Sequence, residues 1–358
     1  MCKKKHPKKI LLAGMIAATL LTCGFGPNFG GVGQEMPAEP DLKEERVTIS
    51  LAGDCSLGNL SIHGYEGTFR EMYDLHGPGY FFQNVKPIFD ADDMTLVNFE
   101  GVLTDSNNRV EKTFNIKGKP EYIQILPLAG IDAVSFGNNH QIDYGQQGIT
   151  DTVTLFESAK IPYAYDDRLG VFETETGIKI GFVSVDEVSD GRKVEAYLQN
   201  GIQQLRQAGA HLVLACCHWG VESVHYPESY QTELGRKCID WGADLVVGCH
   251  PHVLQGVEYY NGKYILYSLG NFCFGANKNP KDKNTMIAQA TFTLENGVST
   301  KEAELTLIPC SISSIPGRNN YCPIVADGEN RALILQKLNE YSSRFGITVG
   351  EDGKVIHP

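Results

Sequence analysis

Residues 246–256 read VVGCHPHVLQG, and the fold has to be built around this stretch. The apolar run from Leu245 to Val247 has the unbroken, β-branched character of a strand that is buried on both faces. Gly248 breaks the run, so His250 and His252 follow at the end of the strand. Two histidines in that place raise the question of what they bind.

Apolar runs of the same kind recur along the chain and alternate with helix-like stretches. The predicted strands are VTISLAGD (47–54), MTLVNFEG (94–101), DAVSFGNNH (132–140), IKIGFVSVD (178–186), HLVLACCHWG (211–220) and ADLVVGCHPH (243–252). The predicted helices lie near 80–90, 146–159, 195–209, 228–242 and 329–345. After His252, Asn261-Gly262 and Asn296-Gly297 indicate antiparallel pairs of strands. We therefore expect an α/β fold whose sheets are completed by antiparallel strands.

The composition is that of a globular protein with an acidic surface. The 358 residues are 42% hydrophobic and 21% charged, and 43 acidic against 31 basic residues give a formal net charge of -12. A nucleic-acid partner would meet a repulsive field, so we expect no nucleic-acid binding.

The first residues carry the pattern of an export signal. Five lysines precede an apolar stretch that begins at Ile10 and ends near Thr22, which predicts a signal peptide or membrane anchor over 1–26. Cys23 resembles the cysteine of a lipoprotein signal, although Thr22 is unusual before it. A lipid anchor, an uncleaved anchor and clean cleavage all stay open, with tethering favoured. Residues 27–46 read as a flexible spacer and 47–358 as the folded domain, on the extracytoplasmic face of the cell membrane.

The chain has ten cysteines whose spacing does not indicate a disulfide framework. Cys216, Cys217, Cys249 and Cys273 fall inside apolar runs and are expected to be buried free thiols. The best candidates for a disulfide are Cys310 and Cys322, on either side of a loop that contains proline and glycine.

Nearly every predicted strand ends in a side chain that can bind a metal ion. The carboxyl ends of strands in an open α/β sheet point into one crevice, so these side chains can meet although they are far apart in sequence. Each of them alone could be a cap, a turn former or a core histidine, and only the coincidence favours a site. Carboxylate, amide and imidazole together suit Mn²⁺, Fe²⁺ or Zn²⁺. The residues are Asp54, Glu100, Asn138, Asn139, His140, His218, His250 and His252.

Six motifs in order along the chain resemble the poly-γ-glutamate capsule synthesis protein CapA family. They are AGDCSLG (52–58), NFEG (98–101), GNNHQIDYG (137–145), HWGVES (218–223), GCHPHVLQGVE (248–258) and YSLGNF (267–272). That family in turn resembles calcineurin-like metallophosphoesterases, which implies a two-sheet sandwich flanked by helices. The resemblance further implies one or two divalent ions, held by Asp54, Glu100, Asn139, His218, His250 and His252, with His140 as the acid that protonates a leaving oxygen.

The sequence departs from the metallophosphoesterase pattern at the first strand. An Asp-x-His motif is usual there, whereas Asp54 is followed by Cys55 and Ser56, so one ligand is missing. Two hypotheses stay open: a metal-dependent hydrolase or transferase that acts on a phosphoester or on the growing polymer, and a non-catalytic accessory that binds the anionic polymer. For either, the resemblance implies surface-polymer synthesis or export beside a membrane-bound synthetase complex that ligates glutamate.

Overall fold

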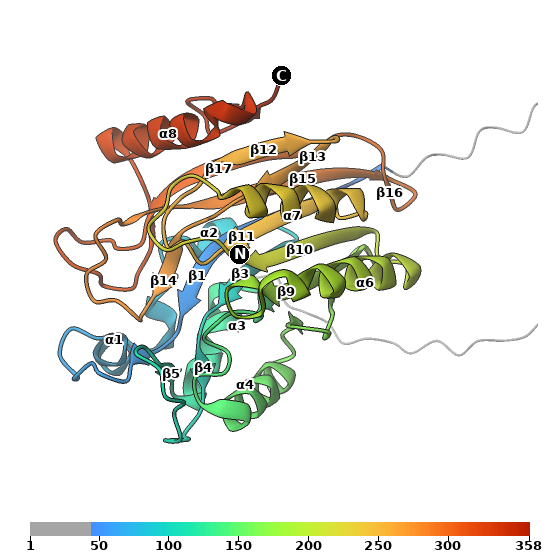
Figure 1. Ribbon diagram of the computed structural model, residues 1–358. Helices are drawn as coiled ribbons and strands as arrows, with labels where there is room; N and C mark the ends of the chain where they lie inside the picture. The colour runs from blue at the N-terminus through green and yellow to red at the C-terminus, as the bar shows by residue number, and fades with distance from the viewer. Residues whose placement is uncertain (1–43) are drawn as a thin grey trace, which may run out of the picture. The chain divides into compact units, whose positions relative to one another are not determined.

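The computed structural model describes residues 44–358, which form two main β-sheets with helices on their outer faces (Figure 1). The predicted signal or anchor over 1–26 and most of the predicted spacer lie outside these residues. The first strand, β1 (Glu44–Ser56), includes the last three residues of the range 27–46. Among the described residues, no helix combines the length and the apolar character needed to cross a membrane.

The larger sheet has a parallel half and an antiparallel half. Strands β1, β3, β6, β7 and β14 run parallel, whereas β15, β17 and β18 are antiparallel to their neighbours. The strands in spatial order are β18 (Ile324–Val325), β17 (Glu304–Ser311), β15 (Asn284–Glu295), β1, β3 (Met94–Phe99), β6 (Ala133–Ser135) and β7 (Tyr163–Ala164), with β14 (Asn271–Phe274) paired to β1 and β16 (Val298–Ser299) paired to β15.

The smaller sheet has a parallel centre and antiparallel edges. Strands β9, β10, β11 and β13 are parallel, and β8 and β12 pair antiparallel at the two edges. The order is β12 (Val257–Tyr260), β13 (Lys263–Leu266), β11 (Leu245–Cys249), β10 (Leu212–His218), β9 (Lys179–Asp186) and β8 (Gly170–Glu173). Short strands form two further small sheets: β2 (Asn59–Leu60) with β5 (Ile116–Gly118) and β4 (Val102–Leu103), and β19 (Thr348–Val349) with β20 (Val355–Ile356).

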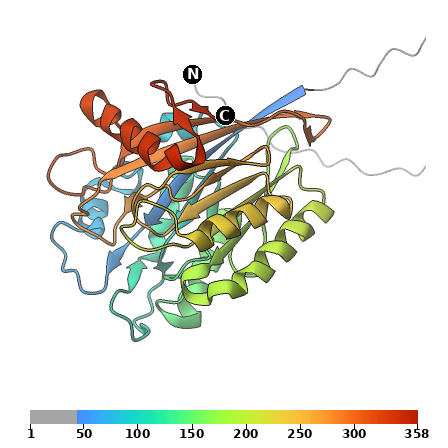
Figure 2. The same cartoon turned by 45° about the horizontal axis from the view of Figure 1, so that its top comes forward.

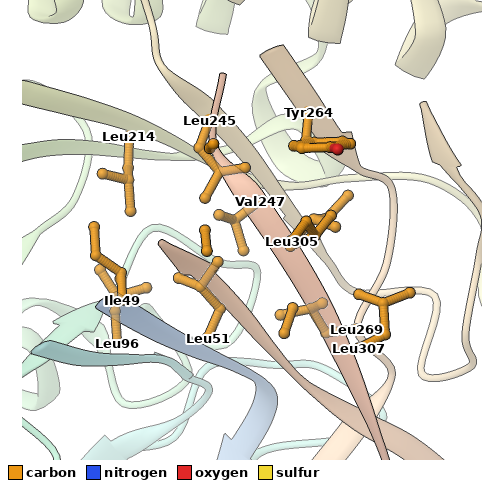
Figure 3. Close-up of a cluster of buried hydrophobic side chains, with 14 of the residues drawn as sticks. Ile49, Leu51, Leu96, Leu214, Leu245, Val247, Tyr264, Leu269, Leu305 and Leu307 are labelled. Atoms are coloured by element: carbon orange, nitrogen blue, oxygen red, sulfur yellow. The ribbon is translucent and has the colours of Figure 1, made fainter. Parts of the chain in front are cut away.

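The inner faces of the two main sheets share one apolar core, which Figure 3 shows in close-up. Ile49 and Leu51 of β1 belong to the same buried cluster as Leu214 of β10 and Val247 of β11. Each of these side chains is at most 3% exposed. Burial of apolar surface between the sheets stabilises the sandwich.

Helices cover the outer faces of both sheets. The larger sheet carries α1 (Phe69–His76), α2 (Lys86–Phe89), α3 (Ile125–Ala129) and α4 (Gly145–Ala159), and the smaller sheet carries α6 (Val194–Gln207) and α7 (Ser229–Asp240). The short α5 (Glu187–Asp190) follows β9, and α8 (Gly328–Ser342) packs on the core beside β17. Figure 2 shows α6 and α7 side by side.

The stripe of buried side chains on α6 explains its position. Val194, Leu198, Ile202 and Leu205 recur at helical spacing and pack on the strands beneath, as an amphipathic surface helix requires. Helix α7 begins with a capping box, in which Glu228 and Gln231 each accept a hydrogen bond from the backbone N–H of the other.

The predicted fold class, an α/β two-sheet sandwich flanked by helices, is confirmed, as are the six strands and the antiparallel pairs around Asn261-Gly262 and Asn296-Gly297. The helix predicted near 80–90 is wrong in extent. Only Lys86–Phe89 is α-helical there, because Pro87 has no backbone N–H and is tolerated only in the first turn of a helix. The longer helix lies earlier, at Phe69–His76.

The cysteine predictions have a mixed outcome. Cys216, Cys217, Cys249 and Cys273 are buried free thiols, as expected. The predicted disulfide between Cys310 and Cys322 is wrong, because both are free and buried. Cys310 Sγ donates to the Ile308 carbonyl, and Cys322 Sγ accepts from the Asn84 amide, so each thiol has a separate local partner.

Candidate metal centre

The carboxyl ends of both sheets meet at one edge of the sandwich, because β1 of the larger sheet lies beside β11 of the smaller one. Asp54 lies near the end of β1, Glu100 follows β3, and His252 follows β11. One ligand atom from each of these three residues lies within 4.8 Å of the others. We call these three residues the acidic triad. Their convergence from three strand ends makes a geometry that can hold a cation.

Asp54 is buried, and both of its oxygens have partners. Oδ1 accepts a hydrogen bond from Asn98 Nδ2 at 2.8 Å, and Oδ2 lies 3.0 Å from His252 Nδ1. Burial alone would lower the pKa of His252, but the carboxylates of Glu100 and Asp54 raise it to about 9. The ring therefore carries a proton at neutral pH, and a metal ion bound to this nitrogen would displace it.

Glu100 is fully buried, and neither of its carboxylate oxygens has a hydrogen-bond partner within residues 44–358. Its Oε1 lies 3.7 Å from His252 Nε2 and 3.8 Å from His140 Nε2. Burial raises the pKa of Glu100 well above its usual range. A buried carboxylate without donors is costly for the fold, so this side chain is placed as a ligand would be rather than as a structural group.

A second cluster, which we call the imidazole cluster, comprises Asn139, His218 and His250. His218 Nε2 lies 3.1 Å from Asn139 Oδ1 and 3.2 Å from His250 Nδ1. Burial and the other imidazoles lower the pKa of His218 well below its usual range, and they lower that of His250 to about 4. Both rings are therefore neutral at pH 7, which is the form that binds a metal ion.

Asn98 joins the imidazole cluster to the acidic triad. Its side-chain nitrogen lies 2.8 Å from Asp54 Oδ1 and 3.3 Å from His218 Nδ1. The two clusters therefore adjoin within one buried network.

His140 is held at the edge of the acidic triad by an ion-paired carboxylate. Its Nδ1 lies 2.7 Å from Asp143 Oδ2, and Asp143 Oδ1 accepts from Lys112 Nζ at 2.7 Å. Burial lowers the pKa of His140, although the hydrogen bond to Asp143 acts in the opposite direction. The ring is thus neutral, with Nδ1 toward Asp143 and Nε2 toward Glu100.

The loop that carries the two histidines of the GCHPH motif has an unusual backbone. His250 has φ 96° and His252 has φ 57°, a region that L-residues rarely adopt. Such conformations cost about 1–3 kcal/mol each and persist where the surroundings impose them. In these backbone conformations, one short loop places the His250 ring in the imidazole cluster and the His252 ring in the acidic triad.

The structure therefore brings Asp54, Glu100, Asn139, His140, His218, His250 and His252 to one edge. Asn138 differs, because its amide donates to the backbone carbonyls of Phe99 and Phe136 and so supports the loop. Sequence reasoning missed Asn98, Lys112, Asp143 and Asn271. Asn98, Asp143 and Asn271 lie inside motifs already singled out, NFEG, GNNHQIDYG and YSLGNF, and that position was the available signal.

Comparisons with known proteins point to the family that the motifs resemble. Residues 48–276 match the family described as bacterial capsule synthesis protein PGA_cap. The capsule biosynthesis protein CapA of Bacillus anthracis is 28% identical over 298 residues, covering 76% of this chain and 70% of that protein. The PGA biosynthesis protein CapA of Bacillus subtilis (strain 168) is 29% identical over 293 residues, covering 76% and 74%.

Among solved structures, the calcineurin-like phosphoesterase YfkN of Bacillus subtilis aligns with a TM-score of 0.48 at 14% identity, over 85% of this chain and 99% of that one. The family match spans most of the chain and contains every residue of the acidic triad and the imidazole cluster. The resemblance inferred from the motifs is confirmed: the chain belongs to the bacterial capsule synthesis protein PGA_cap family.

Proposed function

We propose that this protein acts in the synthesis or export of poly-γ-glutamate or a similar anionic surface polymer, as a metal-dependent member of its family. Two relatives are named for capsule or PGA biosynthesis, and they match this chain over about three quarters of its length. The lysine-rich start and apolar stretch of residues 1–26 support tethering at the extracytoplasmic face of the membrane, beside a synthetase complex. Residues 47–358 form the working domain in this proposal.

Asp54, Glu100 and His252 would hold one divalent ion, and Asn139, His218 and His250 would hold a second, with Glu100 as the carboxylate that the family resemblance implies to be shared. The observation that carries this proposal is Glu100. Its two buried oxygens have no donor within residues 44–358, while ligand atoms of Asp54 and His252 lie within 4.8 Å. The donor set of carboxylate, amide and neutral imidazole fits Mn²⁺, Fe²⁺ or Zn²⁺.

Once bound, such an ion supplies Lewis acidity at a phosphoryl or carbonyl oxygen. His140 is placed to act as the acid once its Nε2 has taken up a proton, which it would then donate to a leaving oxygen. Its Nε2 faces the acidic triad, while Asp143 fixes the opposite nitrogen. Asp143 would also stabilise the charged ring, and Lys112 Nζ forms an ion pair with Asp143 at 2.7 Å.

A second candidate function is a non-catalytic accessory that binds the polymer through the same ions. Ser56 favours this second candidate. It occupies the place where a metallophosphoesterase has a ligand histidine, so the metal position at the acidic triad would be weakened. The arrangement of His140 and Asp143 favours catalysis, since binding alone does not need a proton donor.

Metal analysis of the purified full-length protein tests the proposal. We expect one Mn, Fe or Zn ion per chain to stay bound through dialysis and a second ion to exchange readily. Hydrolysis of a chromogenic phosphodiester and of a γ-linked glutamate oligomer, both with added Mn²⁺, then separates the two candidates. His140→Ala should abolish turnover in the enzyme and change nothing in an accessory. If the purified protein binds no ion, the proposal of a metal-dependent function is refuted.

A further inference from the structure

Asn271 lies directly beside Asp54 in the sheet. Strands β1 and β14 are parallel, and their register pairs Asp54 with Asn271. Paired residues of neighbouring strands present their side chains on the same face of a sheet. Asn271 is 4% exposed. Its amide is therefore buried on the face from which Asp54 reaches His252.

The hydrogen bond of Asn271 fixes which way its amide points. Nδ2 donates to the backbone carbonyl of His252 at 3.1 Å, a contact that only the NH₂ end can make. Oδ1 is thus the opposite atom, and it is buried with no hydrogen-bond partner among the described residues. Asp54 and Asn271 both hold His252, one through the ring and one through the backbone.

Two neighbours of the Asp54–His252 pair also carry buried oxygens without a hydrogen-bond partner in residues 44–358. Besides Asn271 Oδ1 they include both oxygens of Glu100 and Ser56 Oγ, which lies two residues beyond Asp54 on β1. Buried polar atoms normally have partners, so orphaned oxygens on residues next to Asp54 and His252 fit a site that binds a cation. All of them are acceptors or ligand atoms that a cation would satisfy.

We propose that Asn271 Oδ1 is a metal ligand of the acidic triad and takes the place of the histidine that the Asp54-Cys55-Ser56 sequence lacks. This inference rests on the proposed function and adds a ligand to it. The completed position has oxygen from Asp54, Glu100 and Asn271 and one nitrogen from His252.

The added oxygen makes the two positions chemically different. Carboxylate and carbonyl oxygens suit Mn²⁺ and Mg²⁺, whereas imidazole suits Zn²⁺ and Fe²⁺. The position at the acidic triad should therefore prefer Mn²⁺ or Mg²⁺. The imidazole cluster should prefer Zn²⁺ or Fe²⁺.

The test compares full-length wild type, Asn271→Ala, Asn271→Asp and the matched control Asn339→Ala, which removes a half-buried amide of α8 instead. Equilibrium dialysis measures Mn²⁺ and Zn²⁺ binding, and Mn²⁺ electron paramagnetic resonance reports the ligand field. We expect Asn271→Ala to weaken one Mn²⁺ position at least tenfold and to leave the Zn²⁺-preferring position unchanged. Asn271→Asp should keep both ions with an altered Mn²⁺ spectrum, and the control should resemble wild type.

The experiment distinguishes a failure of the inference about Asn271 from a failure of the proposed function. Two ions bound by folded Asn271→Ala as tightly as by wild type would overturn the role of Asn271 and leave the proposed function standing. A wild type without any ion would overturn the proposed function itself. If Asn271→Ala does not fold, Asn271→Asp decides: a Mn²⁺ spectrum and affinity identical to those of wild type would overturn the inference.

Discussion

Two buried carboxylates at opposite ends of the strands have opposite surroundings. Asp244 precedes β11 at the amino ends, and its oxygens accept hydrogen bonds from Arg206 Nη2, Lys263 Nζ and the backbone N–H of Val213. Glu100 follows β3 at the carboxyl ends, and its two oxygens accept from no group within the described residues. Burial is similar, at 4% and 0% exposure. Only the supply of donors differs.

The difference separates a structural carboxylate from a ligand. A buried charge that is fully hydrogen-bonded ties elements together, and removing it leaves its partners unpaired. A buried carboxyl group whose oxygens accept from no donor adds no hydrogen bond to the fold, and its placement fits a ligand. The hydrogen-bond partners of a buried carboxylate therefore say more about its role than its degree of burial does.

The largest expected effect comes from exchanging the two carboxylates for amides, one at a time. Glu100→Gln should weaken metal binding at least 100-fold, because it removes the shared anionic ligand, yet leave the metal-free protein as stable or more so. Asp244→Asn should lower the free energy of unfolding by about 2 kcal/mol and leave metal binding unchanged. Dialysis and urea unfolding measure the two quantities. Equal destabilisation by both changes would remove the distinction.

The next effect concerns the imidazole cluster alone. His250→Ala should release the tightly held ion, by on the order of 100-fold in affinity, because His218 and Asn139 lose the third member of their cluster. The ion at the acidic triad should remain, weaker and exchanging. Metal content after extended dialysis measures this change. Loss of both ions together would show that the clusters act as one site.

Much of the candidate metal centre could be predicted, because the ends of buried strands can be recognised in the sequence. His218, His250 and Asp54 each follow an apolar run, and the rule that parallel strands share a carboxyl edge brings them together. The antiparallel pair after Asn261 was visible for a similar reason, since its turn chemistry is local.

What could not be predicted depends on partners that are distant in sequence. Asn271 lies beside Asp54 because of the register of β14 against β1, and no local sequence pattern encodes that register. Asp143 matters because Lys112 reaches it from another loop. The pairing of Cys310 with Cys322 failed for the same reason, since a suitable loop does not bring two sulfur atoms into disulfide geometry.

A smaller effect is expected at Ser56, where the missing histidine can be restored. Ser56→His should tighten the weaker ion about tenfold, or about 1.4 kcal/mol, because an imidazole is a stronger donor than a hydroxyl. The gain should be larger in the Asn271→Ala background, where the competing oxygen is gone. Mn²⁺ dialysis of the four variants forms the cycle. Equal gains in both backgrounds would mean that Ser56 and Asn271 serve different ions.

The smallest effect is expected at Asp92, a carboxylate whose supply of hydrogen-bond donors lies between those of Asp244 and Glu100. Asp92 precedes β3 at the amino ends, and its Oδ2 accepts from Thr95 Oγ1 while Oδ1 has no partner in the part of the chain described. Burial raises the pKa of Asp92 to about 7. The folded protein therefore keeps a proton that the unfolded chain has released, so stability falls as pH rises from about 4 to 7.

Partial exposure of Asp92 limits this loss of stability to about 1 kcal/mol. Asp92→Asn stays neutral throughout, so it should equal wild type near pH 4 and exceed it in unfolding free energy above pH 7. Urea unfolding across that range measures the difference, with Asp244→Asn as the carboxylate control that should be less stable than wild type at pH 7. Parallel pH profiles for wild type and Asp92→Asn would show that donors to one oxygen are enough to make a half-buried carboxylate structural. The distinction drawn from Glu100 would then apply only where donors are absent from both oxygens.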